Sequence, residues 1–106
     1  MIDLDHLAQK AKELGAHIFF RTLAIRIIKE KGLITGVLAE DDSCEEITAT
    51  SKAVIVATGG FGDNPKMIKK FTGYQHGRDL FSFRIPGVAG DGLRMAWEVG
   101  AARSEM

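Results

Sequence analysis

The sequence is poor in cysteine and has no long hydrophobic run, and each scarcity excludes a class of protein. The single cysteine, Cys44, cannot form an internal disulfide, which fits a reducing compartment. Its acidic turn should raise the pKa of the thiol, so we expect no nucleophile there. The longest apolar run, residues 53–57, is far too short to cross a bilayer, and the N-terminal stretch lacks the features of a signal peptide. We therefore expect a cytoplasmic protein that does not contact a membrane.

Charge of one sign is also lacking, because 14 lysines and arginines balance 14 aspartates and glutamates. A chain without a basic excess has no electrostatic footprint for nucleic acid. His6, His17 and His76 form no metal-ligand spacing with Cys44, so we expect no metal site. With 106 residues, 45% of them hydrophobic, and no low-complexity linker, the sequence predicts one globular domain with a core.

The N-terminal residues predict a helix and a short strand. Apolar residues recur at helical spacing across residues 4–14, which indicates an amphipathic helix. Asp3 is its expected N-cap, and Gly15 stands where a left-handed residue ends a helix. The run "HIFF" at residues 17–20 then predicts a short strand that is buried on both faces.

Residues 22–50 predict a three-stranded antiparallel meander. Apolar, β-branched segments are separated there by "EKG" and by the polar run "EDDSCEE". Gly32 can take the positive φ that a tight turn between two strands requires.

The pattern changes at "AVIVA", residues 53–57, which does not alternate between apolar and polar residues. Both faces of such a strand should be covered, which is typical of a central strand in a parallel sheet. A helix should follow "GGFGDNP", with Asn64 as N-cap and Pro65 in the first helical position. Met67, Ile68 and Phe71 would form the inner face of this helix.

The C-terminal residues predict a loop and a final helix. Residues 73–90 have no clear period and several glycines, so we expect a long loop. The last helix should run from about residue 91 to residue 100, with Asp91 as its cap. Met95 and Trp97 would pack this helix on the sheet.

The turn after "AVIVA" is a first candidate site. Ala57, Thr58, Gly59 and Gly60 would lie beyond the carboxyl end of the strand, where ligands bind in open α/β sheets. Glycine has no Cβ, so a phosphate or a ring can approach the main chain closely. Because this is not the GxGxxG fingerprint, a tight strand-to-helix turn without a ligand explains the same residues.

The start of the last helix is a second candidate. Gly90, Asp91 and Gly92 open the helix, where free N–H groups and the helix dipole attract anions and polar ligands. The Asp91 carboxylate is an acceptor that suits a ribityl or sugar hydroxyl better than a phosphate. A simple N-cap eased by glycines is the alternative.

Three motifs in order carry a family resemblance. They are "ELGAHIFFRTLAIRIIKEKGLITGV", "KAVIVATGGFGDN" and "GDGLRMAWEVGA". With fitting spacing, they resemble segments of the flavin-binding domain of the fumarate reductase and succinate dehydrogenase flavoprotein family. That family includes soluble fumarate reductases, L-aspartate oxidase and 3-ketosteroid dehydrogenases. The resemblance runs through most of the chain.

The resemblance implies an α/β fold, as part of a Rossmann-like FAD-binding domain with the three-stranded antiparallel meander inserted. It implies that Ala24, two residues after Thr22, contacts the adenine of FAD through its backbone. It also implies that the turn at 57–60 lies against the flavin dinucleotide and that Asp91 contacts the cofactor. The cofactor-binding residues that we expect are Ala24, Ala57, Thr58, Gly59, Gly60, Asp91 and Gly92.

Two parts of the family pattern do not occur in this sequence. No GxGxxG turn is present, and nothing matches the substrate-clamping arginines and histidine of the family's later segments. We therefore expect residues 1–106 to be a central fragment of one FAD-binding domain that lacks the first βαβ unit and holds no catalytic residue. Its partners would be the remainder of the flavoprotein chain and, in the parent protein, a small-molecule substrate.

The expected function is hydride transfer between flavin and an activated C–C bond, with the isolated chain inactive and binding FAD weakly at best. The alternative is a free-standing, non-enzymatic module for nucleotide binding or protein interaction. A nicotinamide-dependent reductase fits less well, because "ATGG" followed by "GDG" is not a nicotinamide fingerprint. The edge to which the first strand would add also predicts that the fragment dimerises.

Overall fold

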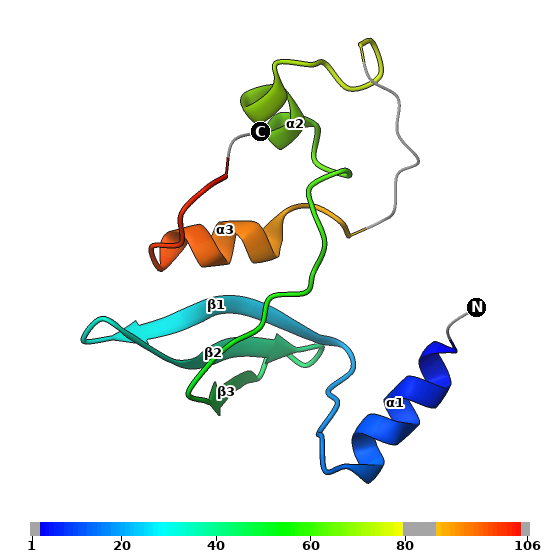
Figure 1. Cartoon of the computed structure of the whole chain (residues 1–106), viewed down its shortest axis with the longest axis vertical. Helices are drawn as coiled ribbons and strands as arrows, with labels where there is room; N and C mark the ends of the chain where they lie inside the picture. The colour runs from blue at the N-terminus through cyan, green and yellow to red at the C-terminus, as the bar shows by residue number, and fades with distance from the viewer. Residues whose placement is uncertain (1–2, 80–86, 105–106) are drawn as a thin grey trace.

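The computed structural model describes residues 3–79 and 87–104, and Figure 1 shows how their elements are arranged. A three-stranded sheet lies at one end, α3 lies over it, α2 stands beyond α3, and α1 lies apart beside the sheet. In chain order the elements are α1 (Leu4–Glu13), β1 (Thr22–Glu30), β2 (Leu33–Asp41), β3 (Glu46–Thr50), α2 (Pro65–Thr72) and α3 (Asp91–Glu98). None of the helices in these described ranges is long and apolar enough to span a membrane.

The meander predicted over residues 22–50 is confirmed as a sheet of order β1-β2-β3 with two antiparallel pairs. Lys31 and Gly32 join β1 to β2 with φ angles of 51° and 77°. Positive φ at both central turn residues matches the twist of the flanking strands, as expected for Gly32. In the next loop, Asp41 Oδ1 accepts hydrogen bonds from two backbone N–H groups at 2.9 and 3.0 Å, so this loop closes locally.

Gly36 lies where β2 passes close to β3. A Cβ atom at this position would collide with the backbone oxygen of Ala49, so only glycine fits between these strands. The β1–β2 ladder also contains one extra residue on each side, Ile25 in β1 and Thr35 in β2. Such bulges bend a strand and increase its twist, and α3 packs on this bent ribbon.

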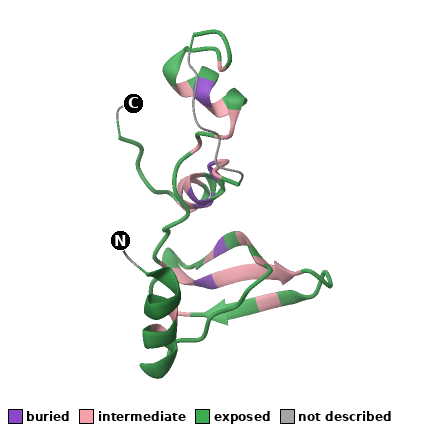
Figure 2. Cartoon of the chain, turned by 90° about the vertical axis from the view of Figure 1, so that its right-hand side faces the viewer, coloured by how far each residue is buried: buried purple, intermediate pink, exposed green. Residues whose placement is uncertain are grey.

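The predicted N-terminal helix is confirmed, but nothing in the described chain covers its apolar face. Asp3 Oδ1 accepts hydrogen bonds from two backbone N–H groups of the first turn at 3.1 and 3.3 Å, and Gly15 ends the helix with a φ of 98°. Leu4, Leu7 and Leu14 remain 75%, 52% and 76% exposed. Figure 2 shows α1 exposed along its length beside the sheet.

The prediction of a short strand at residues 17–20 is wrong. Residues 16–19 have no regular structure, and Phe19 and Phe20 are exposed rather than buried. A strand exists only through hydrogen bonds to a neighbour, and no other described segment lies alongside these residues in the sheet.

The central strand predicted at residues 53–57 is also absent from the described sheet. The segment is a connection that runs from the end of β3 past α3 toward α2 (Figure 1). Ile55 is 92% exposed and Val56 is 40% exposed, so the segment is not covered on both faces. The described residues pair only antiparallel strands, and a parallel strand needs a partner that a hairpin cannot supply.

The helix predicted after "GGFGDNP" is confirmed as α2. Asn64 is its N-cap, Pro65 is its first residue, and Gly73 ends it in the left-handed conformation. Ile68 is 4% exposed, and Met67 and Phe71 on the same side are half-buried. The expected loop at 73–90 includes residues 80–86, which lie outside the described residues; the described parts, 73–79 and 87–90, contain turns and no helix.

The last helix is shorter than predicted and starts differently. α3 ends at Glu98 instead of residue 100, and its N-cap is Gly90, with a φ of 84°, rather than Asp91. A left-handed cap residue favours glycine, which leaves Asp91 in the first helical turn. Met95 is 4% exposed and lies against the sheet as expected, but Trp97 packs edge-on against Phe71 of α2, with ring centroids 5.3 Å apart.

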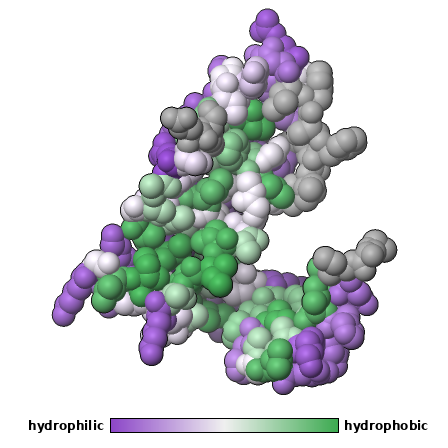
Figure 3. Space-filling model, in the orientation of Figure 1, coloured by the Kyte–Doolittle hydropathy of each residue, from purple (hydrophilic) through white to green (hydrophobic). Residues whose placement is uncertain are grey.

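The described chain buries little apolar surface. Its buried hydrophobic residues are Ile27, Ile68 and Met95. The radius of gyration is 16.3 Å, whereas a compact domain of this length has about 13 Å. The accessible surface is 8737 Å², against about 5,800 Å² for a compact protein of this mass. Figure 3 shows hydrophobic side chains at the surface where α3 meets the sheet and again over α1.

Candidate functional site

Hydrogen bonds hold the two glycine-rich segments together, although they are far apart in the sequence. The Asn64 side chain accepts a hydrogen bond from the Met67 N–H at 3.2 Å and donates one from Nδ2 to the Ala89 oxygen at 2.9 Å. The Asp63 N–H donates to the Val88 oxygen at 2.8 Å. The residue that caps α2 therefore also fixes the chain that leads into α3.

Two glycines allow the start of α3 to pack closely. A Cβ atom at Gly90 would lie 2.5 Å from the Met67 sulfur, and one at Gly92 would collide with the Thr58 side chain and lie 2.6 Å from Val56 Cγ1. Both glycines are buried. Because neither has a side chain, the start of α3 packs closely on Met67 of α2 at Gly90 and on Val56 and Thr58 at Gly92.

The turn at residues 57–60 presents main chain to solvent. All four residues are exposed. Gly59 has a φ of 80°, which favours glycine, and a Cβ atom there would lie 3.6 Å from Val88. A Cβ atom at Gly60 would meet nothing within 4 Å. This bare edge leaves room for the close approach of a flat or phosphorylated ligand to the main chain.

A cavity of about 130 Å³ lies beside this turn. It brings Ala24 of β1 next to Thr58, although 34 positions separate them in the sequence, and Met95 of α3 lines it as well. The remaining lining residues are apolar: Ile27, Val37, Val54, Ile55 and Val56. Two of the predicted residues, Ala24 and Thr58, therefore line one cavity, and a third, Gly92, packs on Thr58.

The other predicted residues do not line this cavity. Ala57, Gly59 and Gly60 form the exposed turn, and Asp91 is exposed in the first turn of α3. A carboxylate in that position complements the positive end of the helix dipole. Their contacts with a cofactor stay predictions. Within the described residues, no group of three or more His, Cys, Asp and Glu side chains is arranged to hold a metal ion.

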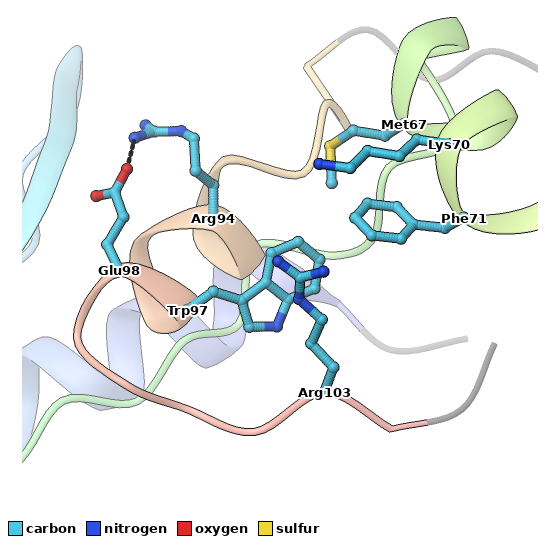
Figure 4. A pocket seen from close by; sticks show the side chains of 7 residues that line it. All are labelled: Met67, Lys70, Phe71, Arg94, Trp97, Glu98 and Arg103. Carbon is cyan, nitrogen blue, oxygen red and sulfur yellow. Dashed lines mark hydrogen bonds and ion pairs between the residues drawn. The ribbon is translucent and has the colours of Figure 1, made fainter.

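A larger cleft, which the sequence did not indicate, lies between α2 and α3. Its volume is about 390 Å³, and it is lined by Met67, Lys70, Phe71, Arg94, Trp97, Glu98 and Arg103. Figure 4 shows side chains from α2 pointing toward Trp97 of α3 and toward Arg103 of the C-terminal segment. Helical spacing indicated that Phe71 and Trp97 would face inward, but nothing local to either helix indicated that they would meet.

The expected effect on Cys44 is confirmed. Cys44 is exposed, and the neighbouring Glu40 carboxylate raises the pKa of its thiol. The larger cause is a hydrogen bond from the thiol to Glu40, which stabilises the protonated form, and the negative charge of Glu40 acts in the same direction. The thiolate is therefore suppressed, as the acidic turn predicted.

The profile of the family described as "FAD binding domain" matches residues 4–106, which is nearly the whole chain. A vinyl phenol reductase of Lactiplantibacillus plantarum is 38% identical over 99 residues, which cover 92% of this chain and 20% of the reductase. An NADH:acrylate oxidoreductase of Vibrio harveyi is 31% identical over 101 residues, which cover 92% of this chain and 10% of that protein.

Among solved structures, the open conformation of a flavocytochrome c3 fumarate reductase is similar to this chain. The TM-score is 0.78 at 27% sequence identity, and the match covers 92% of this chain and 17% of the fumarate reductase. The chain thus spans between 10% and 20% of the length of the relatives compared.

Proposed function

Because this chain belongs to the FAD binding domain family, we propose that residues 1–106 are the central part of the flavin-binding domain of a fumarate reductase-type oxidoreductase. FAD is the cofactor that this family binds. When bound, the flavin supplies the redox chemistry, exchanging a hydride with an activated C–C bond. The chain contributes binding and orientation of the cofactor.

The observation that carries this proposal is the exposed main chain of the 57–60 turn beside the buried contact of Gly92 with Thr58. In the proposed complex the dinucleotide lies along this turn, because no Cβ at Gly60 keeps it away. Ala24 borders the adenine through its backbone. The exposed Asp91 carboxylate accepts a hydrogen bond from a hydroxyl of the cofactor.

The substrate that we propose is a small molecule whose C–C double bond is conjugated to an electron-withdrawing or aryl group. The names of the similar proteins support this class, since they refer to vinyl phenol, acrylate and fumarate. We assign no catalytic residue to this chain. We therefore expect no turnover from the 106 residues alone.

We propose that the remainder of a flavoprotein chain covers the apolar surface that this chain leaves open. The 53–57 segment would then become a central strand of a parallel sheet, which accounts for its unbroken apolar run. The 92% exposure of Ile55 and the uncovered leucines of α1 support this assignment. Burying such surface is favourable by about 25 cal/mol per Å².

Two glycines provide a matched test of the proposed flavin contact. Gly60→Leu places a side chain on the exposed turn, and Gly62→Leu places the same side chain two residues further on. A Cβ atom at either position meets nothing within 4 Å, so neither change should destabilise the fold. In the flavoprotein, Gly60→Leu should weaken FAD binding about tenfold or more, as measured by cofactor titration, and Gly62→Leu should leave it nearly unchanged. Equal FAD affinity in the two variants would contradict the proposal.

The gene sequence on both sides of these codons distinguishes the flavoprotein from the alternative, a free-standing interaction module. An upstream strand, GxGxxG turn and helix in the same reading frame would support the flavoprotein. A start codon at Met1 and a stop codon after Met106 would favour the module, whose exposed apolar faces would then meet another protein.

A further inference from the structure

The cleft between α2 and α3 is separate from the proposed flavin site. It shares no lining residue with the cavity beside the 57–60 turn. Its volume of about 390 Å³ lies in the range of small-molecule sites, which are mostly apolar with a few polar groups. The elements that form it are α2, α3 and the C-terminal segment (Figure 4).

A row of three aromatic rings supports one wall of this cleft. The Phe61 and Phe71 centroids are 5.8 Å apart, and the Phe71 and Trp97 centroids are 5.3 Å apart with an interplanar angle of 61°. Tilted and edge-on contacts of this kind are favourable, so each ring holds the next in place. Phe71 and Trp97 are only half-buried and therefore offer apolar surface to a ligand.

Two cations, Lys70 and Arg103, lie over this wall. Lys70 Nζ lies 5.4 Å from the Phe71 centroid, and the Arg103 guanidinium lies 5.3 Å from the same centroid and 4.5 Å from that of Trp97. Among residues 3–79 and 87–104, neither cation forms an ion pair. Arg94 differs, because its Nη1 pairs with Glu98 Oε1 at 2.7 Å (Figure 4). Counting the described residues alone, the cleft thus carries two positive charges that no carboxylate pairs with.

We propose that this cleft binds a small organic anion with a flat apolar body, such as an aromatic carboxylate or an aryl phosphate. The planar guanidinium of Arg103 can donate two hydrogen bonds to a carboxylate or phosphate, and Lys70 adds a second positive charge near the same ring. The body of the anion lies against Met67, Phe71 and Trp97. An anion with an apolar body satisfies the charges and covers the exposed rings at the same time.

Trp97 makes the test direct, because it is the only tryptophan in the sequence and lies in the cleft. The 106-residue chain, without flavin, is titrated with benzoate and with phenyl phosphate while Trp97 fluorescence is recorded. Both should change the emission saturably with a dissociation constant on the order of 1 mM. Benzamide, which has the same shape as benzoate and no charge, should bind at least about threefold more weakly.

Variants of residues inside and outside the cleft distinguish specific anion binding from a nonspecific effect of the positive charge of α2. Lys70→Gln and Arg103→Gln should each weaken benzoate about threefold to tenfold, and Arg103→Lys should retain part of the affinity. Lys69→Gln removes a neighbouring charge on α2 that does not line the cleft and should change the affinity less than about twofold. Circular dichroism checks that each variant keeps its helices.

Three results would overturn this assignment. These are an emission change that does not saturate, equal affinity for benzamide and benzoate, and equal effects of Lys69→Gln and Lys70→Gln. If Arg103→Gln alters the fold, the two lysine variants decide the outcome alone. Because no flavin is present, these results do not depend on the proposed flavin site.

Discussion

The meander and the segment that follows it contain similar residues, but only the meander forms a sheet. Both are rich in β-branched apolar side chains, but all of β3 pairs with β2, whereas residues 52–60 form no backbone hydrogen bond with other described residues. The difference lies in the connection. An antiparallel partner is reached through a turn of a few residues, whereas a parallel partner requires a crossover and comes from further along the chain. A strand-like sequence therefore becomes a strand only where a partner is available.

The largest effect is expected from disrupting the meander, whose strands find their partners within the chain. Gly36→Val places a branched side chain against the backbone oxygen of Ala49, which the sheet cannot move without losing the β2–β3 ladder. We expect a loss of about 3 kcal/mol in the free energy of unfolding, measured by urea denaturation. Gly62→Val, in open space, is the control and should have little effect. A stable Gly36→Val sheet would mean that the two strands are less closely packed than described.

A pair of isoleucine truncations compares the two regions directly. Ile27 in β1 is 7% exposed and Ile55 is 92% exposed. In the 106-residue chain, Ile27→Ala should cost about 2 kcal/mol of unfolding free energy, and Ile55→Ala should change it by less than about 0.5 kcal/mol. In the proposed flavoprotein, Ile55→Ala should instead cost about as much as Ile27→Ala. Equal small effects of Ile55→Ala in both proteins would contradict the proposed burial of this segment.

The mildest test uses the loop between β2 and β3. Glu40 raises the pKa of the Cys44 thiol only while the meander is folded. The apparent pKa, taken from the pH dependence of the alkylation rate, should therefore be higher in the folded chain than in urea. Since the folded pKa is the higher one, the contribution to stability is present below the unfolded pKa and is lost as the pH rises through the folded pKa. Glu40→Gln should lower the folded value; an unchanged value would exclude Glu40 as the cause.

The predicted site was only partly accessible from the sequence. The glycines of the 57–60 turn and of residues 90–92 were recognisable because close backbone approach requires glycine. The hydrogen bond from Asn64 to Ala89 that connects these two segments could not be predicted, because it joins residues 25 positions apart. Asp91 was expected to cap the helix because aspartate favours that position, but a left-handed Gly90 occupies it.

The sequence by itself determined the features that depend on near neighbours. These include both N-caps at Asp3 and Asn64, the turn at Gly32 and the three strands of the meander. The caps and the turn are stabilised within a few residues, and the strands pair with their neighbours along the chain through short connections, so a local pattern is sufficient to predict them.

Only the tertiary structure decided which apolar surfaces were covered. It placed Trp97 against Phe71 instead of the sheet, brought Arg103 over both rings, and left Ile55 in solvent. Burial depends on segments that are distant in the sequence, and hydrophobic attraction has no direction that a local pattern could record.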